Sequence, residues 1–346
     1  MSDYEKNEEV PQLSQRESIS EKSKKSSFKR HCARFWWAHL IAFIIIVVVV
    51  VCLIIFVGVP KIAQKKINEA KLTLQGIVVR NTQTQNFTMS INSTITTDGS
   101  QHATIDPFEG VMYLEDWAPQ TPFATVMFPE TNSNKLQAVN VTTQFVPILD
   151  LNAFTVFNTW LLVNESLRVT VKGHTKIKVR GISKKFGVNF KKTITMPGLS
   201  NFNGTTVPES TISLEADENG DNFKGTVTIP NRSLVTFDVG NASFHNYLLG
   251  EEIGTVYIDN MLLLPGYNNY SMHANISQMP VLTAIQEKPY CSDGILPFEL
   301  RGKTVVNNGQ PLSYYADALG STNQSVPIDI GYDLQKDLNI TVTCSS

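Results

Sequence analysis

The feature that most limits how this chain can fold is an uninterrupted apolar run from Leu40 to Val59. It reads LIAFIIIVVVVVCLIIFVGV and contains no charged or strongly polar side chain. As an α-helix, these 20 residues would extend over about 30 Å, the thickness of the hydrocarbon core of a bilayer. Helices buried in soluble proteins rarely reach this length without a polar face. A cleaved signal peptide would not follow 39 residues of chain or lack a small-x-small cleavage site. The run therefore predicts one uncleaved membrane span, a signal anchor.

The residues around the span favour a cytosolic N-terminus. Six Lys or Arg side chains precede it, from Lys22 to Arg34, and four lysines follow it, from Lys61 to Lys71. This excess has the sign of the positive-inside rule but is small. A second indication is that every Asn-x-Ser/Thr triplet lies after the span, because glycosylation of this motif takes place in the secretory lumen. We therefore place the C-terminal part in a lumen or outside the cell. The candidate glycosylation sites are Asn86, Asn92, Asn140, Asn164, Asn203, Asn231, Asn241, Asn269, Asn275, Asn323 and Asn339.

The cysteines agree with this orientation. Cys52 lies in the span and Cys32 precedes it, which leaves Cys291 and Cys344 as the pair beyond the membrane. In an oxidising compartment such a pair is expected to form a disulfide; two separate buried thiols are the alternative. Closing this loop of about 50 residues would stabilise the fold by about 4 kcal/mol. Cys32 is either palmitoylated or an unmodified thiol beside the membrane.

Composition and periodicity divide the chain into five segments. Residues 1–34 are polar and serine-rich, and we expect a disordered cytosolic tail. Residues 35–60 contain the transmembrane signal anchor, and residues 61–71 are expected to continue as a juxtamembrane helix. Two lumenal β-sandwiches are predicted, the first over 72–200 and the second over 201–346.

Strands are predicted where apolar and polar residues alternate. Residues 87–91 show this pattern, and so do 167–171, 177–179 and 338–342. Each run is expected to have one buried and one solvated face. The Asn-Gly pair within Asp217–Asp221 indicates a hairpin turn. The predicted fold class is therefore mainly β, with one N-terminal transmembrane helix followed by two tandem sandwiches.

A short internal repeat supports the two tandem domains. Residues 110–116 (GVMYLED) parallel 254–260 (GTVYIDN), and 171–173 (VKG) parallel 300–302 (LRG). The two copies would be joined near 198–204.

The sequence lacks the patterns of common catalytic and metal sites. Its six histidines are scattered, and there is no Gly-x-Ser-x-Gly element. Gly302-Lys303-Thr304 resembles the end of a phosphate-binding loop, but Pro297 occupies the place of the first glycine. The acidic turn at Asp217 lacks the glycine and glutamate of a calcium loop. We expect a protein that is not an enzyme and that has no cofactor and no bound metal.

The charge distribution argues against a nucleic-acid partner. The formal net charge is -2, and the basic residues are interleaved with threonine and valine, which we interpret as the absence of a single basic stripe. Proteins that bind nucleic acid usually carry such a stripe.

Three segments suggest a family. They are His102-Ala-Thr-Ile-Asp-Pro-Phe108, Val171-Lys-Gly173 and Met196-Pro-Gly-Leu-Ser-Asn-Phe202. Together with the span, they resemble a fungal family of vacuolar-type single-pass membrane proteins with LEA type 2-like lumenal repeats, a domain of unknown function. The resemblance covers most of residues 70–346 and carries no catalytic residue. It implies fibronectin-like β-sandwiches with a short helix, at the vacuolar membrane; the plasma membrane and the endoplasmic reticulum are the alternatives.

Residues 152–164 carry apolar side chains at the spacing of a short amphipathic helix. The resemblance implies a lipid groove between sheet and helix, lined here by Phe154, Phe157, Trp160 and Leu161; a helix that only caps the core is the alternative. Two functions follow. The first is an adaptor or sensor whose cytosolic tail binds a protein partner, and the alternative is a lumenal lipid-binding or lipid-transfer module. The expected partners are thus the lipid bilayer, a cytosolic protein and a lipid ligand.

Overall fold

The computed structural model describes residues 35–100 and 102–345. The predicted cytosolic tail, including Cys32, lies outside the described residues. By its internal contacts the chain forms two units, Met1–Ile62 and Ala63–Ser346.

The apolar run of the sequence is helical. Helix α2 (Trp36–Leu53), a π-helical turn η1 (Ile54–Gly58) and helix α3 (Val59–Glu69) follow one another without a break. In the described part of the chain, Trp36–Glu69 is the one helix long and apolar enough to cross a membrane, and none of its most apolar stretch is buried. By length and composition, the predicted span is confirmed.

Strands dominate the second unit, which confirms the predicted mainly-β fold. The strands up to residue 197 are β1 (Lys71–Arg80), β2 (Asn86–Thr96), β3 (Ala103–Ile105), β4 (Phe108–Leu114), β5 (Ala124–Phe128), β6 (Thr131–Asn132), β7 (Leu136–Ala138), β8 (Val141–Pro147), β9 (Ser166–Val179) and β10 (Lys185–Pro197). Those that follow are β11 (Thr206–Ile212), β12 (Phe223–Asn231), β13 (Val235–Leu248), β14 (Glu251–Leu263), β15 (Gly266–Ile276), β16 (Ile295–Asn307), β17 (Gln310–Pro311) and β18 (Gln324–Asp329). The helices between them are α4 (Leu151–Val163), η2 (Ser200–Phe202), α5 (Gln278–Ala284), α6 (Tyr290–Asp293) and α7 (Ser313–Leu319), and α8 (Ile330–Leu338) follows the last strand.

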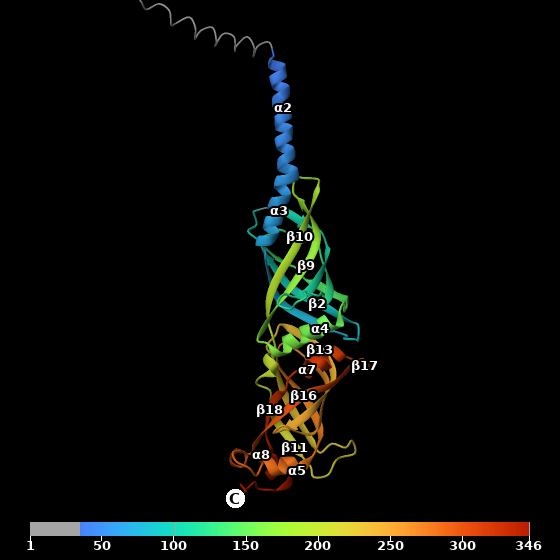
Figure 1. Cartoon of the computed structure of the whole chain (residues 1–346), viewed down its shortest axis with the longest axis vertical. Helices are drawn as coiled ribbons and strands as arrows, with labels where there is room; N and C mark the ends of the chain where they lie inside the picture. The colour runs from blue at the N-terminus through green and yellow to red at the C-terminus, as the bar shows by residue number, and fades with distance from the viewer. Residues whose placement is uncertain (1–34, 101, 346) are drawn as a thin grey trace, which may run out of the picture. The chain divides into compact units, whose positions relative to one another are not determined.

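A six-stranded sheet contains the longest hairpin among the strands before residue 198. Its order is β5-β4-β9-β3-β6, and β10 pairs with the other edge of β9. β9 and β10 are antiparallel and paired without interruption from Ser166 opposite Pro197 to Lys178 opposite Lys185 (Figure 1). Leu167, Val169 and Val171 are buried, as their alternation predicts.

A twelve-stranded sheet crosses the predicted boundary between the sandwiches. Its main path is β11-β12-β15-β14-β13-β1-β2-β7. β1 joins β13 in parallel, with Ile77 opposite Val235 and Val78 opposite Thr236. Strands from both predicted sandwiches therefore share one sheet, and the boundary near residue 200 stays a prediction.

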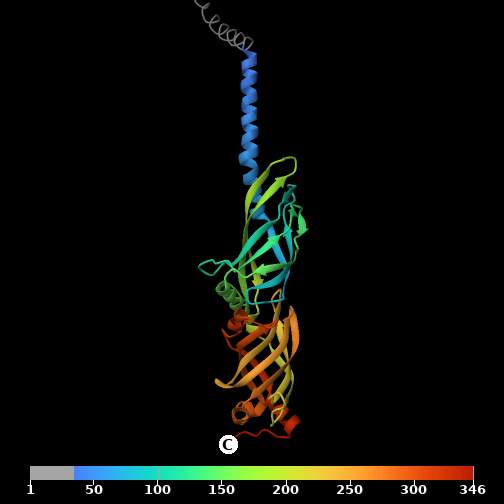
Figure 2. The same cartoon turned by 90° about the vertical axis from the view of Figure 1, so that its right-hand side faces the viewer.

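Helix α4 packs at the junction of the two halves of this unit, next to α7 (Figures 1 and 2). It begins where Asp150 caps it, since the carboxylate accepts a hydrogen bond from Ala153 N at 2.7 Å. Phe154 stacks on Phe87 with ring centroids 5.3 Å apart and meets the edge of Tyr314 of α7 at 4.9 Å. The predicted helix is confirmed, and its apolar face joins strands and helix from both halves.

The predicted strand over 338–342 is wrong. Helix α8 ends at Leu338, with apolar residues at every fourth position (Ile330, Leu334 and Leu338), and residues 339–345 after it have no regular secondary structure. Asp329 caps the helix by accepting a hydrogen bond from Tyr332 N at 2.9 Å. Asn339 then has a φ of 54°, a left-handed conformation that asparagine adopts at helix ends.

The repeat motifs lie on strands but in unlike surroundings. The first motif begins on β4, which pairs directly with β9 through Gly110 opposite Gly173. The corresponding strands of the second copy, β14 and β16, are separated by β13. The short sequence match therefore does not reflect the same strand pairing in the two copies.

Replacing Phe154 by alanine should lower the free energy of unfolding by about 3–5 kcal/mol, because a buried ring among aromatic neighbours is removed. Urea unfolding of the full chain in detergent, followed by tryptophan fluorescence, measures this. Phe145→Ala is the control, since that ring is 64% exposed and its loss should cost no more than about 0.5 kcal/mol. Equal losses in the two variants would contradict the packing role of α4.

Candidate functional site

The β9–β10 hairpin is strongly basic. Ser166–Pro197 contains nine Lys or Arg residues and no Asp or Glu. Side chains alternate across a strand, so basic residues at even spacing on β9 fall on its solvent face. The register adds Lys191 opposite Lys172 and Lys185 opposite Lys178. The exposed side chains of this "basic face" are Arg168, Lys172, Lys176, Lys178, Arg180, Lys185 and Lys191.

Carboxylates neutralise the two ends of the basic face. Lys185 Nζ donates to both carboxylate oxygens of Asp106, at 2.9 and 2.7 Å. Arg168 Nε donates to Asp116 Oδ2 at 2.8 Å, and its terminal nitrogen contacts the second oxygen. The Arg168 guanidinium holds the pKa of Asp116 below its usual value. These two cations already have partners within the protein.

Two adjacent lysines of β10 have different roles. Lys191 Nζ lies 3.5 Å from Glu115 Oε1, and attraction to Tyr113 and to Glu115 raises the pKa of Lys191. Lys192 points to the opposite face and donates to the carbonyl oxygen of Asn68 at 3.0 Å. Burial lowers the pKa of Lys192. Lys192 therefore ties the hairpin to the end of α3 and is not part of the basic face.

Four cations of the basic face have no such partner. Within the described residues, no carboxylate lies within ion-pair distance of Lys172, Lys176, Lys178 or Arg180. Like charges this close on neighbouring positions repel one another. The arrangement lowers its electrostatic energy when an anionic partner approaches.

The hairpin is hydrogen-bonded to α3. Gln64 Nε2 donates to Asn189 O at 2.8 Å, and Asn189 N donates to Gln64 Oε1 at 2.9 Å. One turn later, Lys192 contacts Asn68. The direction from Asn68 to Gln64 along α3 is therefore the same as the direction from Lys192 to Asn189 along β10. The hairpin turn at Gly181 therefore extends toward the N-terminal side of α3.

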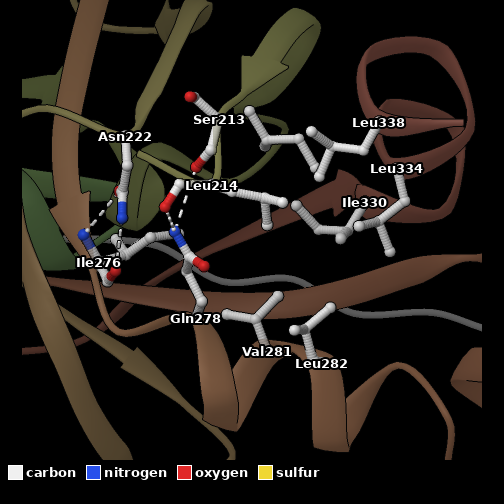
Figure 3. A pocket seen from close by; sticks show the side chains of 11 residues that line it. Ser213, Leu214, Asn222, Ile276, Gln278, Val281, Leu282, Ile330, Leu334 and Leu338 are labelled. Carbon is white, nitrogen blue, oxygen red and sulfur yellow. Dashed lines mark hydrogen bonds between the residues drawn. The ribbon is translucent and has the colours of Figure 1, made fainter. Parts of the chain in front are cut away.

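A second feature is a small apolar cavity between α5 and α8 (Figure 3). Its volume is about 40 Å³, far below the about 300–1,000 Å³ of usual ligand pockets. Gln278 Nε2 donates to Ser213 O at 3.1 Å and to Leu214 O at 2.8 Å, so the amide at its edge is paired. The cavity is a packing defect of the core in this structure and too small for an acyl chain. Its apolar walls are Ile212, Leu214, Ile276, Val281, Leu282, Ile330, Leu334 and Leu338.

The four residues predicted to line a lipid groove do not come together in one. Phe154 and Leu161 are 4% and 1% exposed and pack into the core. Phe157 is half-buried and stacks on Phe123 at 4.6 Å. Trp160 alone of the four lines an open hollow of about 580 Å³, whose wall includes a charged pair. The apolar face of α4 packs on the protein's own strands and on α7, and a lipid groove along this helix stays a prediction.

The predicted cysteine pair is bonded. Cys291 of α6 and Cys344 form a disulfide with Cα atoms 5.1 Å apart. Ser345 N donates to Gln286 O at 2.9 Å beside it. Together these bonds fasten the C-terminal segment to the region after α5.

The candidate glycosylation sites differ in exposure. Asn231 is only 3% exposed, its Nδ2 donates to Val235 O at 2.8 Å, and its Oδ1 accepts from Ser233 N at 2.9 Å. A glycan at this position has no room in the folded protein. The other candidate asparagines are exposed or half-buried.

The sequence interpretation missed the basic face. It took the interleaving of basic and apolar residues as the absence of a stripe, although a period of two on a strand places them on one face. The available signal was the run of 32 residues without a carboxylate. Among the described residues no group of three or more His, Cys, Asp or Glu side chains is arranged to hold a metal ion.

Comparisons with known proteins give a family of unknown function and no activity. Residues 121–246, which include α4, β9 and β10, match a family described as protein of unknown function (DUF3712). No curated protein matches the chain.

Solved structures resemble the chain only remotely. A Salmonella enterica SafA pilin–SafB chaperone complex contains a chain with 9% identity and a TM-score of 0.18, over 70% of this chain and 94% of that one. A Mobiluncus mulieris adhesin shows 9% identity and a TM-score of 0.19, over 80% of this chain and 96% of that one. Similarities this low carry no argument about fold or function.

Breaking sequons should separate occupied from buried sites. Thr142→Ala, which removes the exposed Asn140 sequon, should speed the migration of the protein on a gel by one glycan, and endoglycosidase should abolish the difference. Ser233→Ala removes the Asn231 sequon and should leave migration unchanged, because a glycan on the buried Asn231 amide has no room in the folded protein. A mobility shift in Ser233→Ala would contradict the burial of Asn231.

Proposed function

We propose that this protein is a non-enzymatic single-pass membrane protein whose β-rich part binds the anionic surface of the membrane that anchors it. The observation that carries this proposal is the basic face on β9–β10, four of whose cations are unpaired. The same hairpin is hydrogen-bonded to α3, which directly follows the span.

The chain itself keeps the basic face near the bilayer. Gln64 follows the last residue of the apolar run, Val59, by five positions. Even fully extended, five residues span no more than about 18 Å. Asn189 is bonded to Gln64, and the hairpin runs from there toward the side of α3 nearer the span. The turn after Val179 is therefore within reach of lipid headgroups.

The expected strength follows from the number of free cations. A basic side chain at an anionic membrane surface contributes about 1 kcal/mol. Against a leaflet of comparable anionic-lipid content, four of them would stabilise the docked arrangement by about 4 kcal/mol, enough to hold a domain that is already tethered. Because the screening length is about 8 Å at physiological salt and about 3 Å at 1 M, high salt should release it.

Orientation and compartment belong to the same proposal. The sequons after the span support a cytosolic N-terminus and a lumenal β-rich part. The resemblance to fungal vacuolar-type membrane proteins supports the vacuolar membrane. In this setting the basic face would hold the lumenal part in a defined orientation against the lumenal leaflet.

The proposal is tested with the full chain in lipid nanodiscs. Cys32→Ser and Cys52→Ser remove the two thiols that would otherwise react with the dye. Ser183→Cys in the hairpin turn then carries an environment-sensitive dye. The emission of the dye should shift toward that of an apolar environment in discs with phosphatidylglycerol, and should not shift in discs of pure phosphatidylcholine. Lys176→Gln with Lys178→Gln should lower the docked-to-free ratio about 30-fold, as two cations contribute about 2 kcal/mol.

The matched control replaces two lysines far from this hairpin in sequence, Lys288→Gln with Lys303→Gln, and should dock like the parent chain. An identical dye signal in neutral and anionic discs would refute the proposal. So would equal losses in the two double variants, because the effect would then reflect net charge alone.

The cytosolic tail supports a second candidate function, an adaptor or sensor that recruits a cytosolic protein. Its basis is the serine- and lysine-rich sequence of residues 1–34. Deleting residues 1–30 should abolish the cellular function of an adaptor. A lumenal membrane-binding protein should keep working after the deletion, provided that it still reaches its membrane.

A further inference from the structure

A hollow of about 350 Å³ opens on the solvent face of the six-stranded sheet, at the turn end of the β9–β10 hairpin. The strand register builds it. Thr104 of β3 lies opposite Asn132 of β6 on one side and opposite Lys178 of β9 on the other. Arg180 N donates to His102 O at 3.0 Å, which continues the same pairing by two residues. Since residues two apart on a strand share a face, His102 and Arg180 join Thr104 and Lys178 on that face.

The hollow is rich in hydrogen-bond donors. Its eight lining residues include two permanent cations and no Asp or Glu. Within the described residues, no hydrogen bond or ion pair uses the side-chain nitrogens of His102, Lys178 or Arg180. Asn132 Oδ1 accepts from Thr104 Oγ1 at 3.3 Å, which leaves its Nδ2 as a further donor. These residues offer several hydrogen-bond donors and few free acceptors, so the ligand should be an anion with several oxygens.

We propose that this hollow binds the phosphate monoester headgroup of a lipid in the membrane to which the hairpin docks. The inference rests on the proposed function, because docking brings the hollow to the headgroup layer. It adds selectivity to a surface that would otherwise recognise negative charge alone.

The chemistry favours a monoester over the commoner phosphodiester headgroups. A terminal phosphate carries between one and two negative charges at neutral pH and presents three acceptor oxygens. A phosphodiester has one charge and two free oxygens. Arg180 can bind two oxygens of one phosphate through its planar fork, while Lys178 supplies a point charge. A volume of about 350 Å³ leaves room for the phosphate and part of the group that carries it.

The test compares two anionic lipids in the nanodisc assay with the dye at Ser183→Cys. Phosphatidic acid provides the monoester and phosphatidylglycerol the diester, at matched surface potential. Half-maximal docking should need about tenfold less phosphatidic acid than phosphatidylglycerol. Arg180→Lys keeps the charge but loses the fork, so it should reduce this preference to less than about threefold.

Arg301→Lys is the matched control and should retain the full preference. Equal docking to the two lipids would overturn the headgroup site while leaving the proposed membrane function intact. Absence of docking to either lipid would overturn both. Inorganic phosphate at the same phosphate concentration should not release the hairpin turn from phosphatidic acid discs. Release would show that the hollow binds the free ion and would overturn the lipid assignment.

Discussion

The position of the basic face beside α3 depends on the pair of hydrogen bonds between the Gln64 side chain and the backbone of Asn189. They join the helix that leaves the span to the longest hairpin of the first half, and they determine in which direction that hairpin runs. Backbone groups of a sheet edge are strong donors and acceptors that must find partners. Here an amide side chain satisfies both at once, and Lys192 strengthens the junction from the next turn. A basic face elsewhere on the protein would not meet the bilayer merely because the chain is anchored.

The junction of α4 and α7 determines how much of the protein follows this hairpin. Phe154 and Tyr314 are in edge contact there, and Tyr314 also donates to Gln83 O at 3.0 Å. Beside them β1 pairs with β13, so apolar packing and backbone hydrogen bonds cross the same boundary. One contiguous unit from Ala63 onward is the result. We therefore expect membrane docking of β9–β10 to orient the whole β-rich part instead of a single flexible domain.

The features that depend on residue spacing within one segment could be predicted from the sequence. Those that depend on contacts between segments far apart in sequence could not. The span, the strands with period-two alternation and the helix at 152–164 follow from spacing alone. Near Leu338 the alternation of apolar residues continues past the end of a helix, and residues 339–345 form no strand. The burial of Phe154 could not be predicted, because it depends on a strand and a helix far away in sequence. The basic face needed the register of β9 with β10 and with β3, which no single segment contains.

Hydrogen–deuterium exchange of the unmodified full chain tests the central claim most directly. In nanodiscs with anionic lipid, backbone amides of residues 180–185 should exchange more slowly than in neutral discs, because docking shields the hairpin turn from water. Amides of α5 and α6, which lie far from this hairpin in sequence, should exchange at the same rate in both. Protection that is equal in neutral and anionic discs, or that appears in α5 and α6 instead, would contradict a membrane-binding hairpin.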